Sequence, residues 1–345
     1  MWNEKLSRRE MIKAVLAATA AISAPPVLLG QNAPATQPTR DRYGDILPLR
    51  KLGKTGAWVT MLGLGGHHVG RPSEEEAQKI VEAAIAGGVR FFDCAVVYQN
   101  GLAEERLGKY LTPKYRDVAF LMTKTMAEDA ATAKKELDDS RRRLKTDYLD
   151  LWQMHDHPSP ENVDKRIDGG VVDAMLEAKS KGIVKHIGFT GHVTPKAHLR
   201  MIERVAKEKN NVLETCQMPI NVCDPNYSSF ILQVIPRLLE NGYGVLAMKT
   251  MAGSGFVGLH GTTGPLPNAK RIVPDRVSVE DALHFVWSLP VSCLISGPDT
   301  AEMYKQNISY CKSFNGMSEQ RRQELITKVA DASGTSVEYY KGPVA

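Results

Sequence analysis

Three polar residues recur at equal intervals along this chain, and each one closes a short apolar run. Asp93 follows Phe91 and Phe92, Lys124 ends V-A-F-L-M-T-K, and His155 ends Y-L-D-L-W-Q-M-H. Both intervals are 31 residues long, from 93 to 124 and from 124 to 155. A strand with its crossover helix takes about 30 residues. The spacing therefore predicts that these side chains lie at the same end of three consecutive parallel strands.

A tyrosine, Tyr98, stands five residues after Asp93 and completes a set that can do acid–base chemistry. A phenol has a pKa near 10, so it is a poor acid at neutral pH unless a cation beside it favours the phenolate. Lys124 can supply that cation, and Asp93 can hold the lysine charged and aimed. His155 can share the phenolic proton or orient a carbonyl oxygen. We therefore expect a site that reduces a carbonyl, with hydride arriving at carbon as Tyr98 protonates the oxygen.

Alternating strand and helix patterns must position these residues. The expected strands are 61–66, 89–93, 118–124, 148–155, 184–190, 212–219, 243–248 and 291–296, and the expected helices are 74–86, 104–110, 131–144, 170–181, 195–207, 229–240, 279–288 and 301–311. Eight such units over about 260 residues match a closed (β/α)₈ TIM barrel of the α/β class, whose active site lies at the carboxyl ends of the strands. An open doubly wound sheet is the alternative. Three further segments do not fit the alternation of strands and helices: a hairpin at 49–60, a glycine-rich segment at 253–274 and an extra terminal helix at 318–332.

The first 35 residues are set apart from the fold. Ser7-Arg8-Arg9-Glu10-Met11-Ile12-Lys13 precedes an apolar run from Ala14 to Ala24, and this pattern resembles a twin-arginine export signal. The apolar run is shorter than the roughly 20 residues that span a bilayer. An ordinary amphipathic helix is the alternative. We expect a signal at 1–35, a loose leader at 36–48 and a single barrel domain at 49–345, in a protein that the twin-arginine machinery exports to the periplasm.

Composition narrows the classes of partner. The chain has 345 residues, 43% of them apolar, which is enough for one large core or two modest ones. The formal net charge of +5 is small, so neither nucleic acid nor an acidic membrane surface is expected as a partner. No stretch after the signal is long and apolar enough to cross a membrane. Five cysteines without C-x-x-C spacing indicate buried free thiols rather than a disulfide framework or a zinc site.

Four separated motifs carry a family resemblance. R-K-L-G-K-T-G-A-W-V-T-M-L-G-L-G-G, F-D-C-A-V-V-Y-Q-N-G, L-M-T-K and L-W-Q-M-H, in this order, are similar to the aldo-keto reductase family from Leu49 to about Phe314. The resemblance implies a (β/α)₈ barrel whose hairpin closes the bottom. It also implies that Tyr98, Asp93, Lys124 and His155 are catalytic, that NADP or NAD is the cofactor, and that the substrate is a small-molecule carbonyl compound or a sugar.

The cofactor side of the motif set departs from the family pattern. The fifth strand ends in I-G-F-T-G-H where the family has Ser-Asn for the nicotinamide amide, so Thr190 keeps a hydroxyl but Gly191 has no amide. Gln217 fits the family's glutamine at the end of the sixth strand. Met248 and Lys249 stand where an aromatic residue commonly stacks on the nicotinamide, and Lys249 can instead face the pyrophosphate.

A second departure concerns the 2′-phosphate of NADP. In S-G-P-D-T-A-E-M-Y-K-Q-N, the serine and arginine that clamp this phosphate in the family fall on Pro298 and Met303. Gly297 and Asn307 remain candidates for cofactor contact, and Lys305 can reach toward a phosphate. The resemblance therefore implies that NAD binds at least as well as NADP.

Two readings from other classes stay open. Five of nine histidines follow the first, fourth and fifth strands: His67, His68, His155, His157 and His192. The H-x-H pattern at 155–157 occurs in metal-dependent barrel hydrolases, where neutral imidazoles hold a divalent ion. No carboxylate falls at the end of a late strand to complete such a site, so no metal is expected. The third reading is a barrel that binds a nucleotide or a sugar without turnover.

Overall fold

Eight parallel strands close into a barrel in the computed structural model, which describes residues 37–260, 264–265 and 270–342. The predicted export signal lies outside these residues. The strands are β5 (Leu62–Gly65), β6 (Phe91–Asp93), β7 (Phe120–Thr125), β8 (Leu149–Met154), β9 (Val184–Thr190), β10 (Thr215–Pro219), β11 (Gly244–Met248) and β12 (Cys293–Ser296). They pair in chain order, and β12 pairs with β5 to close the ring. The barrel prediction is confirmed against the open sheet.

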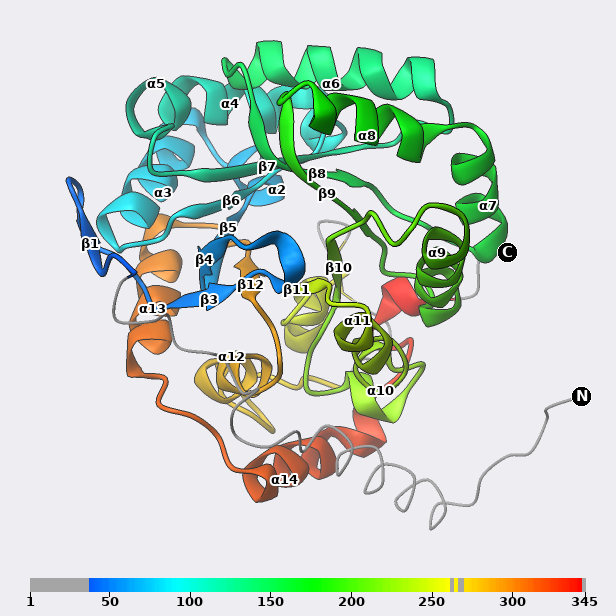
Figure 1. The fold of residues 1–345 in the computed structure, drawn as a ribbon. Helices are drawn as coiled ribbons and strands as arrows, with labels where there is room; N and C mark the ends of the chain where they lie inside the picture. The colour runs from blue at the N-terminus through cyan, green and yellow to red at the C-terminus, as the bar shows by residue number, and fades with distance from the viewer. Residues whose placement is uncertain (1–36, 261–263, 266–269, 343–345) are drawn as a thin grey trace, which may run out of the picture.

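Helices surround the strands on the outside (Figure 1). They are α3 (Glu74–Ala86), α4 (Leu102–Tyr110), α6 (Ala130–Leu144), α8 (Val171–Ser180), α9 (Pro195–Glu208), α10 (Phe230–Gln233), α11 (Ile235–Glu240), α12 (Val279–Trp287) and α13 (Ala301–Ser313). The extra C-terminal helix is present as α14 (Glu319–Val329). Side-chain caps define several helix starts: Ser73 accepts a hydrogen bond from the Glu76 amide of α3, and Asp129 accepts one from the Thr132 amide of α6.

Two helical segments differ from expectation. A single helix was expected over 229–240, but the structure has α10 and α11, separated at Val234. Pro236, in the first turn of α11, has no amide hydrogen and cannot continue a helix from the preceding turn. The sequence analysis also missed α7 (Pro160–Asp168), which Ser159 caps in the loop after β8. This loop therefore carries more structure than a simple connection.

The expected hairpin closes the amino-terminal end of the barrel. Its strands are β3 (Leu49–Lys51) and β4 (Trp58–Thr60). Leu52 and Val59 pack inside the barrel against Phe91 and other buried side chains from the strands. Gly53 has φ 52°, and a Cβ there would lie 2.1 Å from the backbone nitrogen of Gly244. Only a glycine allows this approach, so the hairpin is fixed against the amino-terminal end of the barrel by close backbone contact.

The leader that was expected to be loose contains a short hairpin. β1 (Arg40–Asp41) pairs with β2 (Gly44–Asp45). The carboxylate of Asp41 accepts hydrogen bonds from Arg90 at 2.6 and 2.9 Å, and Arg90 is buried. A bidentate arginine–carboxylate pair holds both groups in one geometry. The described part of the leader is therefore attached to the base of β6.

Apolar side chains fill the space between the barrel and its helices. All five cysteines are buried and unpaired, in agreement with expectation. Within the described residues, no helix is long and apolar enough to cross a bilayer.

Candidate functional site

The ends of β6, β7 and β8 bring the four predicted catalytic residues together. Asp93 ends β6, Lys124 is the next-to-last residue of β7, and His155 follows β8 directly. The Lys124 ammonium donates to the Asp93 carboxylate, to the carbonyl oxygen of Cys94 at 2.7 Å and to the Tyr98 hydroxyl at 3.3 Å. Lys124 is 1% exposed. All three donors of a buried ammonium are therefore used within the site.

A strained turn presents Tyr98 to this cluster. Tyr98 begins the 3₁₀ turn η3 (Tyr98–Gly101), and the next three residues have positive φ: Gln99 at 47°, Asn100 at 55° and Gly101 at 93°. Such backbone is costly for a residue such as glutamine and is concentrated at functional sites. The turn brings the phenol hydroxyl to 3.3 Å from Lys124 Nζ, and the Tyr98 ring lies 5.7 Å from that of His155 at an angle of 85°.

Burial sets the protonation states of the cluster. Burial and the charge of Asp93 raise the pKa of Tyr98 well above its ordinary value, so the net shift is opposite to the lowering that was expected from Lys124 alone. Burial and the charge of Lys124 lower the pKa of His155 well below its ordinary value. Burial also raises the pKa of Asp93, against the effect of Lys124. At neutral pH the site therefore presents a protonated phenol and a neutral imidazole, which are a hydrogen donor and an orienting group for a carbonyl oxygen.

Two polar atoms without hydrogen-bond partners lie at the ends of the next two strands. Thr190 ends β9 and is paired in register with Gln217 of β10. Both residues are buried, and neither Thr190 Oγ1 nor Gln217 Oε1 has a hydrogen-bond partner within the described residues. An unsatisfied buried polar group costs about 1–3 kcal/mol. A ligand carboxamide, with two N–H donors and one acceptor, would fit this pair.

Lys249 lies at the end of β11 with φ 56°. Burial lowers its pKa. Its Nζ is 5.4 Å from the ring centre of Tyr340, which comes from the C-terminal segment. Tyr340 is buried, and its hydroxyl donates to Glu338 and accepts from Asn221. The position of Tyr340 beside Lys249 was not predicted, because nothing in the Tyr339-Tyr340 pair indicates which strand ends it reaches.

The remaining cofactor candidates lie between the end of β12 and the middle of α13. Gly297 is exposed, and a Cβ there would lie 1.9 Å from His68 Nδ1. Asn307 donates to Ser296 Oγ at 2.9 Å. Met303 is 49% exposed, and Lys305 forms an exposed ion pair with Glu302 at 3.3 Å. The structure thus brings Thr190, Gln217 and Lys249 to the strand ends, whereas Lys305 lies on the outer surface.

The histidines at the rim do not form a metal site. Burial and the charge of Arg166 lower the pKa of His157, which is almost fully buried. His192 Nδ1 lies 2.9 Å from Asp156 Oδ1. In the described part of the chain, no three His, Cys, Asp or Glu side chains converge as metal ligands would. The metal-hydrolase reading therefore has no geometric support there.

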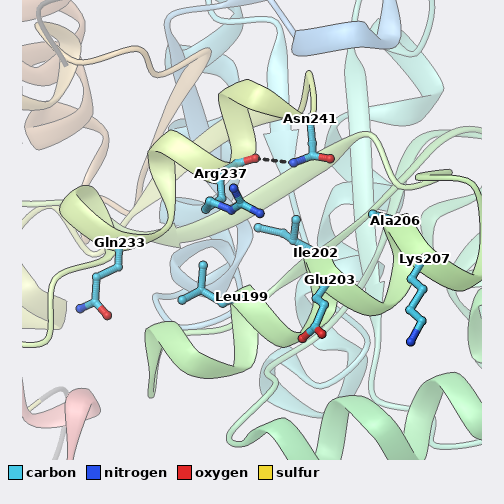
Figure 2. Close-up of a pocket in the computed structure, with 8 residues that line it drawn as sticks. All are labelled: Leu199, Ile202, Glu203, Ala206, Lys207, Gln233, Arg237 and Asn241. Carbon is cyan, nitrogen blue, oxygen red and sulfur yellow. Dashed lines mark hydrogen bonds between the residues drawn. The ribbon is translucent and has the colours of Figure 1, made fainter. Parts of the chain in front are cut away.

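A separate hollow lies on the outside of the barrel, between α9 and α11 (Figure 2). Leu199 and Ile202 form part of its wall, and Glu203, Lys207 and Arg237 surround it. Asn241 donates to the carbonyl oxygen of Arg237 at 2.9 Å, which is the bond drawn in Figure 2. None of the predicted catalytic or cofactor residues lines this hollow. The candidate site is the mouth of the barrel at the strand ends.

A closed (β/α)₈ barrel with an aspartate, a tyrosine, a lysine and a histidine at three adjacent strand ends defines a class of carbonyl oxidoreductase. The sequence profile of the Aldo/keto reductase family matches residues 61–318, and the chain belongs to this family. The family resemblance is thereby confirmed.

Known relatives agree with this assignment. The chain is 26% identical over 289 residues to the uncharacterized oxidoreductase YqkF of Bacillus subtilis, covering 75% of this chain and 89% of that protein. It is 28% identical over 219 residues to L-galactose dehydrogenase of Arabidopsis thaliana, covering 60% and 66%. It is 35% identical over 135 residues to a putative methylglyoxal reductase of Salmonella typhi, covering 39% and 46%.

The fold has solved counterparts. The holo form of an aldo-keto reductase from Bacillus halodurans superposes with a TM-score of 0.68 at 23% identity, over 86% of this chain and all of that one. A putative aldo-keto reductase from Pseudomonas aeruginosa superposes with a TM-score of 0.60 at 21% identity, over 80% and 95%. At these identities the likeness shows the barrel fold alone.

Proposed function

We propose that the protein transfers hydride between a nicotinamide cofactor and the carbonyl or alcohol group of a small substrate, with Tyr98 as the proton donor. The observation that carries this proposal is the buried chain from Asp93 through Lys124 to the Tyr98 hydroxyl. Membership of the Aldo/keto reductase family supports it. A binding barrel without turnover would not need a strained turn to bring a phenol to a buried lysine.

The protein's own groups perform the proton chemistry. Tyr98 keeps its proton at neutral pH and donates it to the substrate oxygen as negative charge develops there. Lys124, fixed by Asp93, stabilises the phenolate that remains after transfer. The neutral ring of His155 orients the carbonyl oxygen toward the phenol. Each group is in place before substrate binds, so little reorganisation is needed during the reaction.

The residues present fit a nicotinamide. Thr190 Oγ1 and Gln217 Oε1 are acceptors that a carboxamide N–H₂ group would satisfy. The bound cofactor would supply or accept the hydride. Lys249 would face its pyrophosphate, and Gly297 and Asn307 would lie near its adenosine end. Pro298 and Met303 offer no charge to a 2′-phosphate, and Lys305 is engaged with Glu302, so NAD is proposed to bind at least as well as NADP.

The names of two relatives suggest the substrate class. One is described as an L-galactose dehydrogenase and the other as a putative methylglyoxal reductase. We propose a small aldehyde, ketone or sugar on this basis.

The test is steady-state turnover with NADH and NADPH over small aldehydes, ketones and sugars, for wild type and Tyr98→Phe. The variant loses the donor but little contact area, so turnover should fall at least 100-fold while cofactor affinity changes little. More than about a tenth of wild-type turnover in the variant would exclude the phenol as the acid. Cofactor affinity, measured by quenching of nucleotide fluorescence, controls for a collapsed site.

We further propose export through the twin-arginine pathway, on the basis of the Arg8-Arg9 motif alone. Since that pathway carries folded proteins, a cofactor loaded before export must stay bound, and we propose that the glycine-rich 253–274 segment, which is long for a barrel connection, helps to retain it. This segment is only partly described. Its start, η5 (Ala252–Val257), packs against the C-terminal segment, where a Cβ on Gly255 would lie 2.0 Å from the Val337 carbonyl oxygen.

Fractionation of cells that produce the wild type and an Arg8→Lys, Arg9→Lys variant tests export. Intact mass and absorbance of protein purified without nucleotide test retention.

A further inference from the structure

An aspartate and a histidine form a pair beside the four predicted catalytic residues. His192 Nδ1 lies 2.9 Å from Asp156 Oδ1. Asp156 directly follows His155, and His192 stands two residues after Thr190. Asp156 thus adjoins a residue assigned to the carbonyl, His192 closely follows one assigned to the nicotinamide, and the proposed function gives the pair no role.

The backbone is shaped to make this contact. A Cβ on Gly191 would lie 3.0 Å from the His198 ring and 3.2 Å from the backbone nitrogen and oxygen of His157. The His157 amide donates to the Thr190 carbonyl oxygen at 3.3 Å, so the loops after β8 and β9 touch at the glycine. Asp156 has φ 57°, a conformation that costs a non-glycine residue about 1–2 kcal/mol. Glycine at position 191 thus allows contact between the loops after β8 and β9, which carry Asp156 and His192.

The pair opens onto the mouth of the barrel. Its side chains are 26% exposed for His192 and 32% for Asp156, whereas Lys124 and Asp93 are almost fully buried. Tyr340 covers one side of the imidazole, with ring centres 5.9 Å apart. Besides the larger effect of burial, the charge of Asp156 acts on the pKa of both Tyr98 and His155, so the pair lies close to the groups assigned to the substrate carbonyl.

The electrostatics suit proton transfer. Burial opposes ionisation of Asp156, but the contact with His192 and the nearby His155 lower its pKa to about 2, so it is a carboxylate at neutral pH. Asp156 Oδ1 lies 2.9 Å from His192 Nδ1 but outside hydrogen-bond geometry, so the carboxylate favours the tautomer with the proton on Nδ1 through its charge alone. The Nε2 atom then carries the lone pair, and no residue that the structure describes forms a hydrogen bond with it. An imidazole oriented in this way by a carboxylate is a general base.

We propose that Asp156 and His192 form a second acid–base pair that removes the proton from the carbon next to the substrate carbonyl, so that the site also enolises α-hydroxy carbonyl compounds. The C–H bond breaks and its proton moves to His192 Nε2. The electron pair forms the carbon–carbon double bond of an enolate, whose oxygen accepts hydrogen bonds from Tyr98 and His155. Return of a proton to the same carbon restores or epimerises the compound, and nothing is oxidised. The inference rests on the carbonyl-binding half of the proposed function and needs no nicotinamide.

The experiment uses dihydroxyacetone in D₂O with nucleotide-free protein, and follows loss of the methylene signal by ¹H NMR. Wild type should exchange hydrogen for deuterium faster than buffer alone. His192→Gln should lower the enzymatic rate by about 100-fold, because general-base catalysis contributes 10²-fold or more. Asp156→Asn should also lower it, since the ring then loses its fixed tautomer. Thermal unfolding of each variant shows that it is folded.

His67→Gln is the matched control. His67 lies on the same rim, with its ring 5.2 Å from that of Tyr98, but its Nδ1 contacts the Gln99 side-chain amide instead of a carboxylate. This variant should retain exchange. Competitive inhibition of carbonyl reduction by dihydroxyacetone shows that the probe enters the site.

The outcomes separate this inference from the proposed function. Wild type that reduces carbonyls with a nicotinamide but exchanges no faster than buffer overturns the inference alone. Folded His192→Gln that exchanges like wild type also overturns it. Exchange that depends on His192, in protein that shows no nicotinamide-dependent turnover, would support the inference and contradict hydride transfer.

Discussion

The two halves of the barrel mouth differ in how their polar groups are satisfied. At the ends of β6 and β7, the Lys124 ammonium has three protein acceptors, so its hydrogen bonds are complete without a ligand. Along β9 and β10, Thr190 Oγ1 and Gln217 Oε1 are buried and have no hydrogen-bond partner among the residues that the structure describes. We call the ends of β6 and β7 the prearranged half, because the hydrogen bonds of Lys124 are complete before a ligand binds. We call the Thr190 and Gln217 region of β9 and β10 the receptive half, because a ligand can supply the missing hydrogen-bond partners.

This difference follows from the tasks proposed for each half. A proton donor must be aimed in advance, because reorganisation during the reaction would add to the barrier. A binding surface gains affinity when its polar atoms gain partners only on binding, since the ligand then relieves a desolvation cost. Gln217 joins the halves, because its side chain lies close enough to Asp93 to lower the pKa of that carboxyl against the larger effect of burial.

The largest expected effect comes from breaking the prearranged half. Asp93→Asn removes the charge that compensates the buried Lys124, and an uncompensated buried charge typically costs about 3–5 kcal/mol. We expect the free energy of unfolding, measured with urea, to fall by about 3 kcal/mol or more. Glu75→Gln, which breaks an exposed ion pair with Lys79, is the control and should have no measurable effect. Equal stability of the two variants would show that the Asp93–Lys124 pair is not what holds this half together.

The second prediction uses pH. Burial raises the pKa of Tyr98 well above 10 and lowers that of His155 well below 6.5, so neither group titrates between about pH 6 and pH 9. Carbonyl reduction uses the protonated phenol and should be nearly independent of pH in this range. Alcohol oxidation needs the phenolate, whose small fraction rises tenfold per pH unit below the pKa. Rates in both directions across buffers test this, and a bell-shaped reduction profile centred near pH 7 would contradict it.

The sequence predicted the prearranged half more completely than the receptive one. Asp93, Lys124 and His155 were found because strand ends in a parallel barrel have a fixed period of about 30 residues. The hairpin at the amino-terminal end of the barrel and the extra C-terminal helix were also predicted correctly. The pKa direction of Tyr98 was not, because burial depends on packing that a sequence pattern does not reveal.

The misses share a physical cause, since each depends on contacts between distant segments. Tyr340 reaches the mouth from the C-terminal segment, which lies about 90 residues after Lys249 in the chain. The hairpin at 40–45 is fixed by Arg90, which no local pattern links to Asp41. The contact between the loops that carry Asp156 and His192 depends on the close approach at Gly191, where the sequence showed only a missing amide.

The third prediction separates binding from folding in the receptive half. Thr190→Val replaces a buried hydroxyl, which has no hydrogen-bond partner in the described part of the chain, by a methyl group of similar shape, so the ligand-free protein should be equally stable or slightly more stable. Nicotinamide binding should weaken about fivefold, the worth of one neutral hydrogen bond of about 1 kcal/mol. Thermal unfolding and cofactor titration measure the two effects. A variant that loses stability but not affinity would show that the Thr190 hydroxyl has a structural partner instead.

The smallest expected effect concerns the adenosine end of the receptive half. Met303 is 49% exposed at the position of the family's phosphate-clamping arginine, and the nearby Lys305 is paired with Glu302. Met303→Arg should shift the ratio of NADP to NAD affinity severalfold toward NADP, because an exposed charge contact is worth only up to about 1 kcal/mol. Met303→Gln is similar in size but uncharged, and should leave the ratio unchanged.

Fluorescence titration of wild type with both nucleotides gives the baseline. If wild type already favours NADP tenfold, a cation elsewhere binds the phosphate and Met303→Arg will add little. If wild type favours NAD and only the arginine variant shifts, position 303 determines the choice of nucleotide.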